Sequence, residues 1–223
     1  MVSVKGIGWI NGTEYGSVSG DRRVRYQDRM ELRTKLFSCP FKGFGKLDDV
    51  SVMLCYAVAL ALKDAGIDYH ADRKQPAGLI GTNASGCLQS DINYFRDYLE
   101  SGRIMARGNL FIYTLPSSPL GEASIHFGLQ GPLLYAAEPG GSLLQAFSIA
   151  ADMIRIDGLP VMLAGSAEVD EAIYCVLSGA AGQEMKGNSI CSLDEAIAVA
   201  ESGRNISGVI NDFMALNKER HSA

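Results

Sequence analysis

Histidine and tryptophan are scarce in this chain, which has three histidines and one tryptophan among 223 residues. The histidines, at positions 70, 126 and 221, are too far apart to form a metal-binding motif, so we expect no metal and no other cofactor. The five cysteines form no CxxC pair, and their odd number argues against a disulfide framework. These scarcities argue against a metal centre and against a disulfide-rich secreted fold.

Long apolar runs and an excess of positive charge are missing as well. No stretch reaches the ~18 apolar residues of a membrane helix, and the sequence shows no signal peptide. The formal net charge of −5 gives no overall basic surface that would attract nucleic acid or anionic lipid. We therefore expect a cytoplasmic protein that binds neither nucleic acid nor membrane.

One local exception is the run over residues 21–35, which contains five arginines and one lysine. Such a run can attract an acidic protein, but mixed charge runs more often face water, and we favour that interpretation. Residues 13–47 around it lack sustained periodicity and are typical of a long connection, with a short helix predicted near 27–35. A structureless connection of this length is uncommon in a compact domain and often binds something.

A hydrophobic content of 47% and 25 glycines are typical of a packed α/β protein with many tight turns. Apolar periodicity and capping residues predict the individual elements. Strands are predicted over 2–10, 77–81, 133–137, 161–164 and 171–178, with a short extended segment over 110–113. Helices are predicted over 48–65, 90–101, 120–129, 141–157, 193–202 and 206–216.

Two of these helices carry different apolar patterns. The helix over 48–65 is apolar nearly all round in its second half, which predicts burial on more than one side. The helix over 90–101 is amphipathic, and its spacing predicts that the side chains at 92, 95, 98 and 99 face the core.

Residues 131–168 combine a strand, a glycine turn, a helix and a second strand, which is one βαβ unit. Both strands should be parallel and buried. Enzymes of this topology often carry a nucleophile in the first turn. Here that turn holds Pro139, Gly140 and Gly141, which offer no attacking side chain, and Ser142 is expected to bond to NH groups of the first helical turn.

Four motifs follow one another along the chain: ALKDAGID at 61–68, GLIGTNASG at 78–86, LFIYTLPSSPLGEASIHFGLQG at 110–131, and the segment from GP to GSAE at 131–168. In this order they resemble the β-ketoacyl synthases, the condensing enzymes of fatty-acid and polyketide synthesis. With Gly131 and Pro132 placed on the family's Gly-Pro, the family's nucleophilic cysteine falls at Gly140. The resemblance covers roughly residues 3–177 and implies a thiolase-like N-terminal half: an α/β fold with a mixed, mainly parallel sheet and helices on both faces.

The resemblance also implies a synthase-like domain over 1–178 and a C-terminal helical extension over 179–223. Condensation in the family needs the cysteine and two further residues from a C-terminal half, either two histidines or a histidine and an asparagine. This chain ends about where that half would begin, so we expect no ketosynthase catalysis. Some relatives carry glutamine in place of the cysteine and act as decarboxylases or chain-length factors, but glycine cannot imitate that amide.

The two halves of the family share a middle layer of helices. Right-handed crossovers lead us to predict the helices over 48–65 and 141–157 on one face of the sheet, in that layer. The chain's own C-terminal helices, a second copy or another chain would have to cover it. Family members also dimerise through the strand matching 133–137, which implies a homodimer or a heterodimer with a ketosynthase, and an acyl carrier protein as a further partner.

Three functional hypotheses follow. The first is a non-catalytic, chain-length-factor-like subunit of bacterial fatty-acid or polyketide/aryl-polyene-type biosynthesis that pairs with a complete ketosynthase. In it, Gly140, Gly141, Ser142 and Cys87 would line a degenerate nucleophile turn or acyl pocket. The second is an acyl-thioester transferase or hydrolase that uses Cys87, His126 or Ser142. The third is a module that binds an acyl chain or an acyl carrier protein without chemistry.

The residues of the second hypothesis also have simpler interpretations. A reactive Cys87 would need a lowered thiol pKa, whereas free cysteines mostly behave as small buried hydrophobic residues. His126 lies on an apolar helix, which favours a packed, hydrogen-bonded histidine over a catalytic one.

Overall fold

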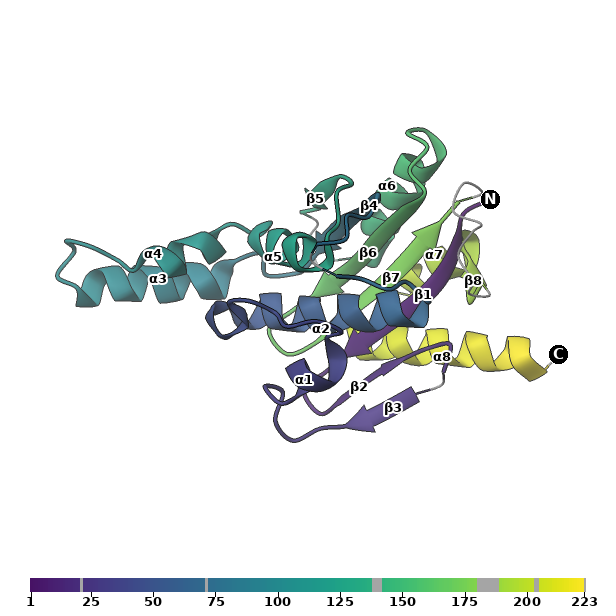
Figure 1. The fold of residues 1–223 in the computed structure, drawn as a ribbon, viewed down its shortest axis with the longest axis horizontal. Helices are drawn as coiled ribbons and strands as arrows, with labels where there is room; N and C mark the ends of the chain where they lie inside the picture. The colour runs from purple at the N-terminus through teal and green to yellow at the C-terminus, as the bar shows by residue number, and fades with distance from the viewer. Residues whose placement is uncertain (21, 71, 138–141, 180–188, 203–204, 223) are drawn as a thin grey trace.

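The computed structural model describes residues 1–20, 22–70, 72–137, 142–179, 189–202 and 205–222. Figure 1 shows a central sheet, helices on both of its faces and one helical arm that projects away from it. The strands are β1 (Ser3–Ile10), β2 (Glu14–Ser17), β3 (Arg22–Arg25), β4 (Ala77–Thr82), β5 (Leu133–Tyr135), β6 (Val161–Ala167), β7 (Ala172–Ser178) and β8 (Cys191–Ser192). The helices are α1 (Leu32–Leu36), α2 (Asp49–Asp64), α3 (Leu88–Glu100), α4 (Gly108–Phe111), α5 (Ser118–Phe127), α6 (Leu143–Arg155), α7 (Leu193–Glu201) and α8 (Ile206–Ser222), with 3-10 turns η1 (Phe44–Lys46) and η2 (Ile112–Thr114).

The sheet has the order β3-β2-β1-β7-β6-β4-β5, with β8 beside β1. Strand β4 pairs in parallel with β5 and β6, and β7 runs antiparallel to both β6 and β1, so β1, β4, β5 and β6 share one direction. The predicted mixed sheet with helices on both faces is confirmed. Among the described strands, however, most neighbouring pairs are antiparallel, so the sheet is not mainly parallel. Strand β7 turns back from β6 and lies between β6 and β1, and β2, β3 and β8 add further antiparallel pairs on the β1 side.

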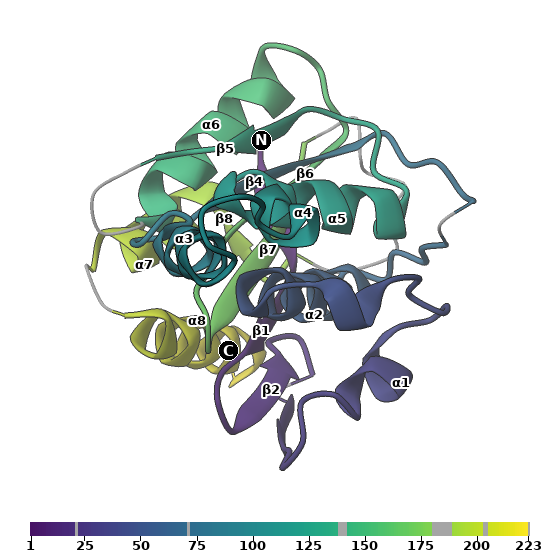
Figure 2. The same cartoon turned by 90° about the vertical axis from the view of Figure 1, so that its left-hand side faces the viewer.

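Helices α2 and α6 lie on opposite faces of the sheet, so the prediction of a common face is wrong. Along β4, Leu79 packs into the cluster formed with α2 and α5, whereas the next residue, Ile80, packs with α6, α7 and α8. Figure 2 shows the two helix groups on the two sides of the strands. The chain crosses from β1 to β4 and on to β5, then returns to β6. Because crossovers are right-handed, helices of outward and returning connections lie on opposite faces of the sheet. Helix α2 belongs to the outward connection from β1 to β4, and α6 belongs to the return from β5 to β6.

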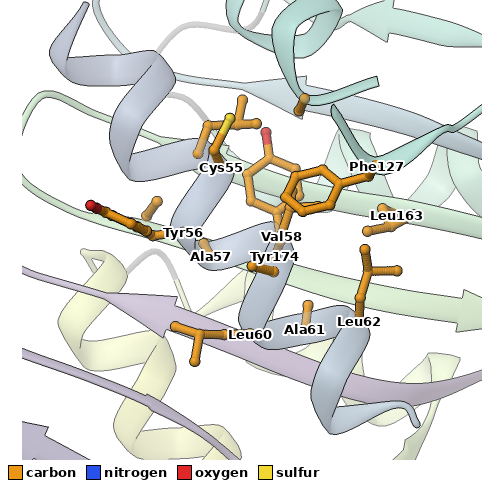
Figure 3. Packing of buried hydrophobic residues seen from close by; sticks show 14 of the residues in the cluster. Cys55, Tyr56, Ala57, Val58, Leu60, Ala61, Leu62, Phe127, Leu163 and Tyr174 are labelled. Atoms are coloured by element: carbon orange, nitrogen blue, oxygen red, sulfur yellow. The ribbon is translucent and has the colours of Figure 1, made fainter. Parts of the chain in front are cut away.

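Helix α2 is the most deeply buried helix of the described chain, with every residue from Ser51 to Leu62 buried. Its side chains meet Phe127, Leu163 and Tyr174 in the core (Figure 3). Gly8 of β1 allows this close packing, because a Cβ there would overlap the backbone of α2. The predicted burial on more than one side is confirmed.

The connection over residues 13–47 is more ordered than the sequence predicts. Strands β2 and β3 form an antiparallel hairpin that extends the sheet beside β1, and α1 lies close to the helix predicted near 27–35. Downstream of α1, the rings of Phe37 and Phe44 pack against Tyr56 of α2 at centroid distances of 5.3 and 5.5 Å. The connection therefore covers the outer side of α2.

The face of the sheet that carries α6 is covered by the C-terminal helices of the same chain. Phe213 of α8 and Ala196 of α7 are buried in one cluster with Phe147 of α6. Helix α7 begins with a capping box between Ser192 and Glu195. In the described part of the chain, no helix is both long enough and apolar enough to cross a bilayer.

Three further elements differ from their predictions. Residues 110–113 are helical in α4 and η2 rather than extended. The strands β5 and β6 run in the same direction as predicted, but β4 lies between them, and β5 is a partly exposed edge strand rather than a buried one. Helix α3 has no buried residue, so its apolar side chains do not face the core. It belongs to the arm, residues 88–115, which has no sheet beneath it (Figure 1).

Candidate functional site

The candidate site lies where β4, β5 and β6 end. These strands are parallel, so their carboxyl ends meet at one edge of the sheet, which is where open α/β sheets commonly bind ligands. The loop over 83–87 follows β4, and Glu168 follows β6. Gly140 and Gly141, which the sequence predicts in a turn after β5, lie outside the described residues.

Asn83 holds this edge together through its side-chain amide. Its Oδ1 accepts hydrogen bonds from the Tyr135 hydroxyl at 2.7 Å and from the Gly86 N–H at 2.9 Å, and its Nδ2 donates to the Gly86 carbonyl at 3.0 Å. Gly86 has a φ of +60°, a left-handed conformation that favours glycine. The end of β5 is thus fixed to a rigid loop after β4.

Glu168 ties the end of β6 to the same loop. Its carboxylate accepts from the Ala84 N–H at 2.6 Å and from the Ser85 hydroxyl at 3.1 Å. Burial, followed by the negative charge of Glu168, raises the pKa of the Tyr135 hydroxyl above its ordinary value. Tyr135 therefore remains a neutral hydrogen-bond donor at neutral pH.

Cys87 lies at the start of α3 and is partly buried. Its Sγ is 3.0 Å from the Thr114 carbonyl and 3.3 Å from Asp91 Oδ2, and both oxygens can accept its proton in a hydrogen bond. Burial, and then the hydrogen bond and charge of Asp91, raise the pKa of the Cys87 thiol. A thiol in this setting is protonated and poorly nucleophilic at neutral pH.

Ser142 and His126 have structural roles. The Ser142 hydroxyl accepts from the Leu144 N–H at 3.2 Å and caps α6, as predicted. His126 is buried on the face that carries α2, with its ring stacked on Phe41 at 3.9 Å. Burial, and then the neighbouring His70, lower its pKa to about 4. The predicted packing of His126 is confirmed, but its predicted hydrogen bonding is not, because the buried Nε2 has no hydrogen-bond partner among the described residues. His126 lies in a different cluster from the loop that carries Cys87.

Three of the five arginines of the basic run pair with carboxylates. Arg23 and Arg25 both pair with Glu14, at 3.7 and 3.2 Å, and Arg29 pairs with Asp49. These contacts reduce the free positive charge of the run and favour the interpretation of a solvated charged surface.

Sequence reasoning found the right edge of the sheet and named Cys87 and Ser142, but it missed Asn83, Tyr135 and Glu168. The only local signal was the composition of the loop itself, because asparagine and glycine close together are typical of a turn that bonds to itself. The contacts that Tyr135 and Glu168 make with this loop span 52 and 84 residues of sequence, which no local pattern reveals.

The family of the chain follows from a match over most of its sequence. The sequence model of the β-ketoacyl synthase N-terminal domain matches residues 12–192. The chain belongs to this family. Among curated β-ketoacyl synthase relatives, it is 26% identical over 136 residues to the putative polyketide beta-ketoacyl synthase 1 of Streptomyces virginiae, across 58% of this chain and 32% of that protein. It is 27% identical over 132 residues to nodulation protein E of Rhizobium sp. strain N33, across 59% of this chain and 32% of that protein.

Solved structures of ketosynthases share the fold. The ishigamide ketosynthase/chain length factor matches with a TM-score of 0.60 at 13% identity, over 85% of this chain and 61% of that one. A β-ketoacyl synthase from Burkholderia phymatum STM815 matches with a TM-score of 0.59 at 16% identity, over 85% and 62%. A type II polyketide ketosynthase in complex with its acyl-carrier protein matches with a TM-score of 0.58 at 12% identity, over 85% and 60%. The thiolase-like fold is therefore confirmed, while the chain spans about a third of the length of the curated relatives, 32% in each case.

Proposed function

We propose that this β-ketoacyl synthase-like chain is a non-catalytic, chain-length-factor-like subunit of bacterial fatty-acid or polyketide/aryl-polyene-type biosynthesis. It pairs in the cytoplasm with a complete ketosynthase and shapes the acyl pocket of that partner. One observation carries the proposal. Glycine stands at position 140, where the resemblance places the nucleophilic cysteine, and the thiol at the same edge of the sheet, Cys87, is a protonated donor to Asp91 and Thr114.

The edge strand β5 supports a partner of similar fold. It is the terminal strand of the sheet and pairs only with β4 among the described strands. Leu133 and Leu134 are 39% and 38% exposed, although they are apolar. A free strand edge with apolar side chains favours addition of a strand from another chain. Two of the similar solved structures are named as a ketosynthase/chain length factor and as a ketosynthase with its acyl-carrier protein, which supports these two kinds of partner.

The residues proposed for an unusual thioester chemistry do not support it. Activation of a nucleophile requires a lowered pKa or an adjacent base. The pKa of Cys87 is raised, the Ser142 hydroxyl caps a helix, and His126 is buried in an aromatic cluster elsewhere. We further infer that residues 179–223 act as an extension that seals the α6 face of the synthase-like domain over residues 1–178.

Co-expression with a ketosynthase from the same gene neighbourhood tests the proposal. We expect the two proteins to co-purify, and we expect the ketosynthase to make products of a different chain length, or none, when this chain is left out. Product lengths are measured by mass spectrometry of the carrier-bound chains. A ketosynthase that neither binds this chain nor changes its products in its presence would contradict the proposal. Stable labelling of this chain by a radiolabelled acyl thioester would instead support a residual enzyme.

A further inference from the structure

A cavity of about 300 Å³ opens between the end of α5 and the connection over residues 39–42, on the face of the sheet that carries α2. Gln75, which precedes β4, fixes this end of α5, because its Nε2 donates to the Phe127 carbonyl at 3.1 Å. Cys87, by contrast, follows the carboxyl end of β4. The cavity therefore lies toward the opposite end of β4 from the candidate site, and the proposed function makes no use of it.

Two stacked rings line the cavity. The rings of Phe41 and His126 are nearly parallel, with a centroid distance of 3.9 Å and an interplanar angle of 6°. Beside them, Ile125 is apolar and 75% exposed. His126 is 4% exposed, and its Nε2 has no hydrogen-bond partner among the described residues. Buried polar atoms without a partner are rare in folded proteins, which favours a bound polar group beside this ring.

The cavity also holds two unpaired charges of opposite sign, Lys42 and Glu122. Within the described part of the chain, these two residues form an ion pair neither with each other nor with any other residue. Glu122 is half-buried, and its carboxylate accepts a long hydrogen bond, 3.5 Å, from the Tyr113 hydroxyl. It lies four residues before His126 in α5, so the carboxylate and the imidazole share one face of the helix.

The other charged residues of the cavity, His70 and Asp72, are exposed and face each other, with Nδ1 and Oδ2 3.6 Å apart. Burial, and then His70, lower the pKa of His126 to about 4, so at neutral pH its imidazole is uncharged and does not repel a cation. A ligand with only a positive charge would leave Lys42 unpaired, and one with only a negative charge would face Glu122. A ligand that carries both charges and an apolar body neutralises both side chains and covers the stacked rings.

We propose that this cavity binds a free amino acid with an aromatic side chain. Glu122 holds the ammonium group, Lys42 holds the carboxylate, and the aromatic side chain packs against Phe41. Offset stacking of aromatic rings adds to this apolar contact. The site goes beyond the proposed function, because it needs neither a ketosynthase nor an acyl chain.

Titration of the isotope-labelled full chain with L-phenylalanine, followed by NMR, tests the site. We expect saturable shifts of backbone amide signals over residues 39–42 and 122–126, with a dissociation constant of about 1 mM. Hydrocinnamate lacks the ammonium group and phenethylamine lacks the carboxylate, but both keep the ring. Each should bind about tenfold more weakly than L-phenylalanine, because each leaves one charge of the cavity unpaired.

Two variants should each affect one charge of the ligand. Lys42→Gln should weaken the binding of L-phenylalanine and hydrocinnamate about tenfold and leave that of phenethylamine unchanged. Glu122→Gln should weaken the binding of L-phenylalanine and phenethylamine and leave that of hydrocinnamate unchanged. Lys46→Gln is the matched control, because Lys46 is an exposed lysine of the same connection that does not line the cavity. This control should bind all three compounds as the wild type does.

The absence of saturable shifts at about ten times the expected dissociation constant would overturn the proposal. It would also be wrong if either analogue bound as tightly as L-phenylalanine, or if Lys42→Gln and Glu122→Gln bound L-phenylalanine as tightly as Lys46→Gln. The comparison of the three compounds uses the wild-type chain, so it decides the matter even if a variant fails to fold. The titration contains no ketosynthase, so failure of the proposed function leaves its result unchanged.

Discussion

Helices α2 and α3 both have a strongly apolar side, but the structure uses them in opposite ways. In α2, every residue from Ser51 to Leu62 is buried between the sheet and the aromatic residues of the 13–47 connection. In α3 no residue is buried, and its apolar side chains face solvent. An apolar helix face shows that something must cover it, but not whether the cover comes from the same chain or from another.

The largest expected effect is the difference in unfolding free energy lost when a leucine is truncated in α2 and in α3. Leu62→Ala in α2 removes a fully buried side chain and should lower the free energy of unfolding by about 2–5 kcal/mol. Leu99→Ala in α3 removes an exposed side chain and should change it by less than about 0.5 kcal/mol in the monomer. Alanine is at least as good a helix former as leucine, so helix propensity adds no cost. Urea unfolding of both variants, at low protein concentration, measures the difference, and equal losses would contradict the contrast.

The second prediction concerns the aromatic cover of α2. Burial lowers the pKa of His126 to about 4, whereas the unfolded residue titrates near its ordinary value of 6.5. Between these values the unfolded chain binds the proton and the folded chain does not, so this stability is present above pH 6.5 and is lost as the pH falls. The loss should reach about 3 kcal/mol near pH 4.

His126→Phe is the control, because phenylalanine fits among the rings of Phe41 and Phe127 and carries no titrating group. Unfolding experiments across this pH range should show wild-type stability falling relative to that of the variant. Parallel pH profiles for the two proteins would show that His126 is not held neutral by its surroundings.

The third and smallest effect concerns the free edge of β5. The Ala136 N–H bonds to the Gly81 carbonyl, so by the alternation of parallel pairing the Tyr135 N–H points away from β4. Tyr135→Pro should therefore remove a donor at the outer edge and weaken association about tenfold, with a smaller effect on folding. Tyr135→Phe loses the same bond to Asn83 but keeps the N–H, so it should associate normally. Sedimentation of both variants checks this, and equal weakening would assign the effect to the Asn83 bond.

How much of this contrast could be predicted from sequence depends on the range of the interactions. Helix α2 was predictable because its signals are local: Asp48 caps it by accepting from the Ser51 N–H, and Gly66 takes the left-handed conformation after its end. The face of the sheet on which α6 lies could not be predicted from the sequence, because it depends on the return of the chain from β5 to β6. The β2–β3 hairpin was missed because its four-residue strands contain several arginines and show no apolar alternation.

The candidate site was predictable in place but not in contents. The order of the motifs located the strand ends, and Cys87 and Ser142 lie there. The hydrogen bonds of Asn83 with Tyr135 and of Glu168 with Ala84 join strands that are distant in sequence, so only the folded chain brings them together. For α3, the spacing of Phe95 and its neighbours predicted an apolar face correctly, but the sequence did not reveal that this face lies on an arm.

The central claim is that this chain acts through association rather than catalysis. The most direct measurement is condensation of acyl and malonyl thioesters by the purified chain, followed by mass spectrometry, for the wild type and for Gly140→Cys. We predict no condensation by either protein, because glycine supplies no thiolate at position 140, and the resemblance assigns the decarboxylating pair to no residue of positions 1–223. Alkylation of the variant thiol alone would not change this expectation. Turnover by the unmodified chain would contradict the account.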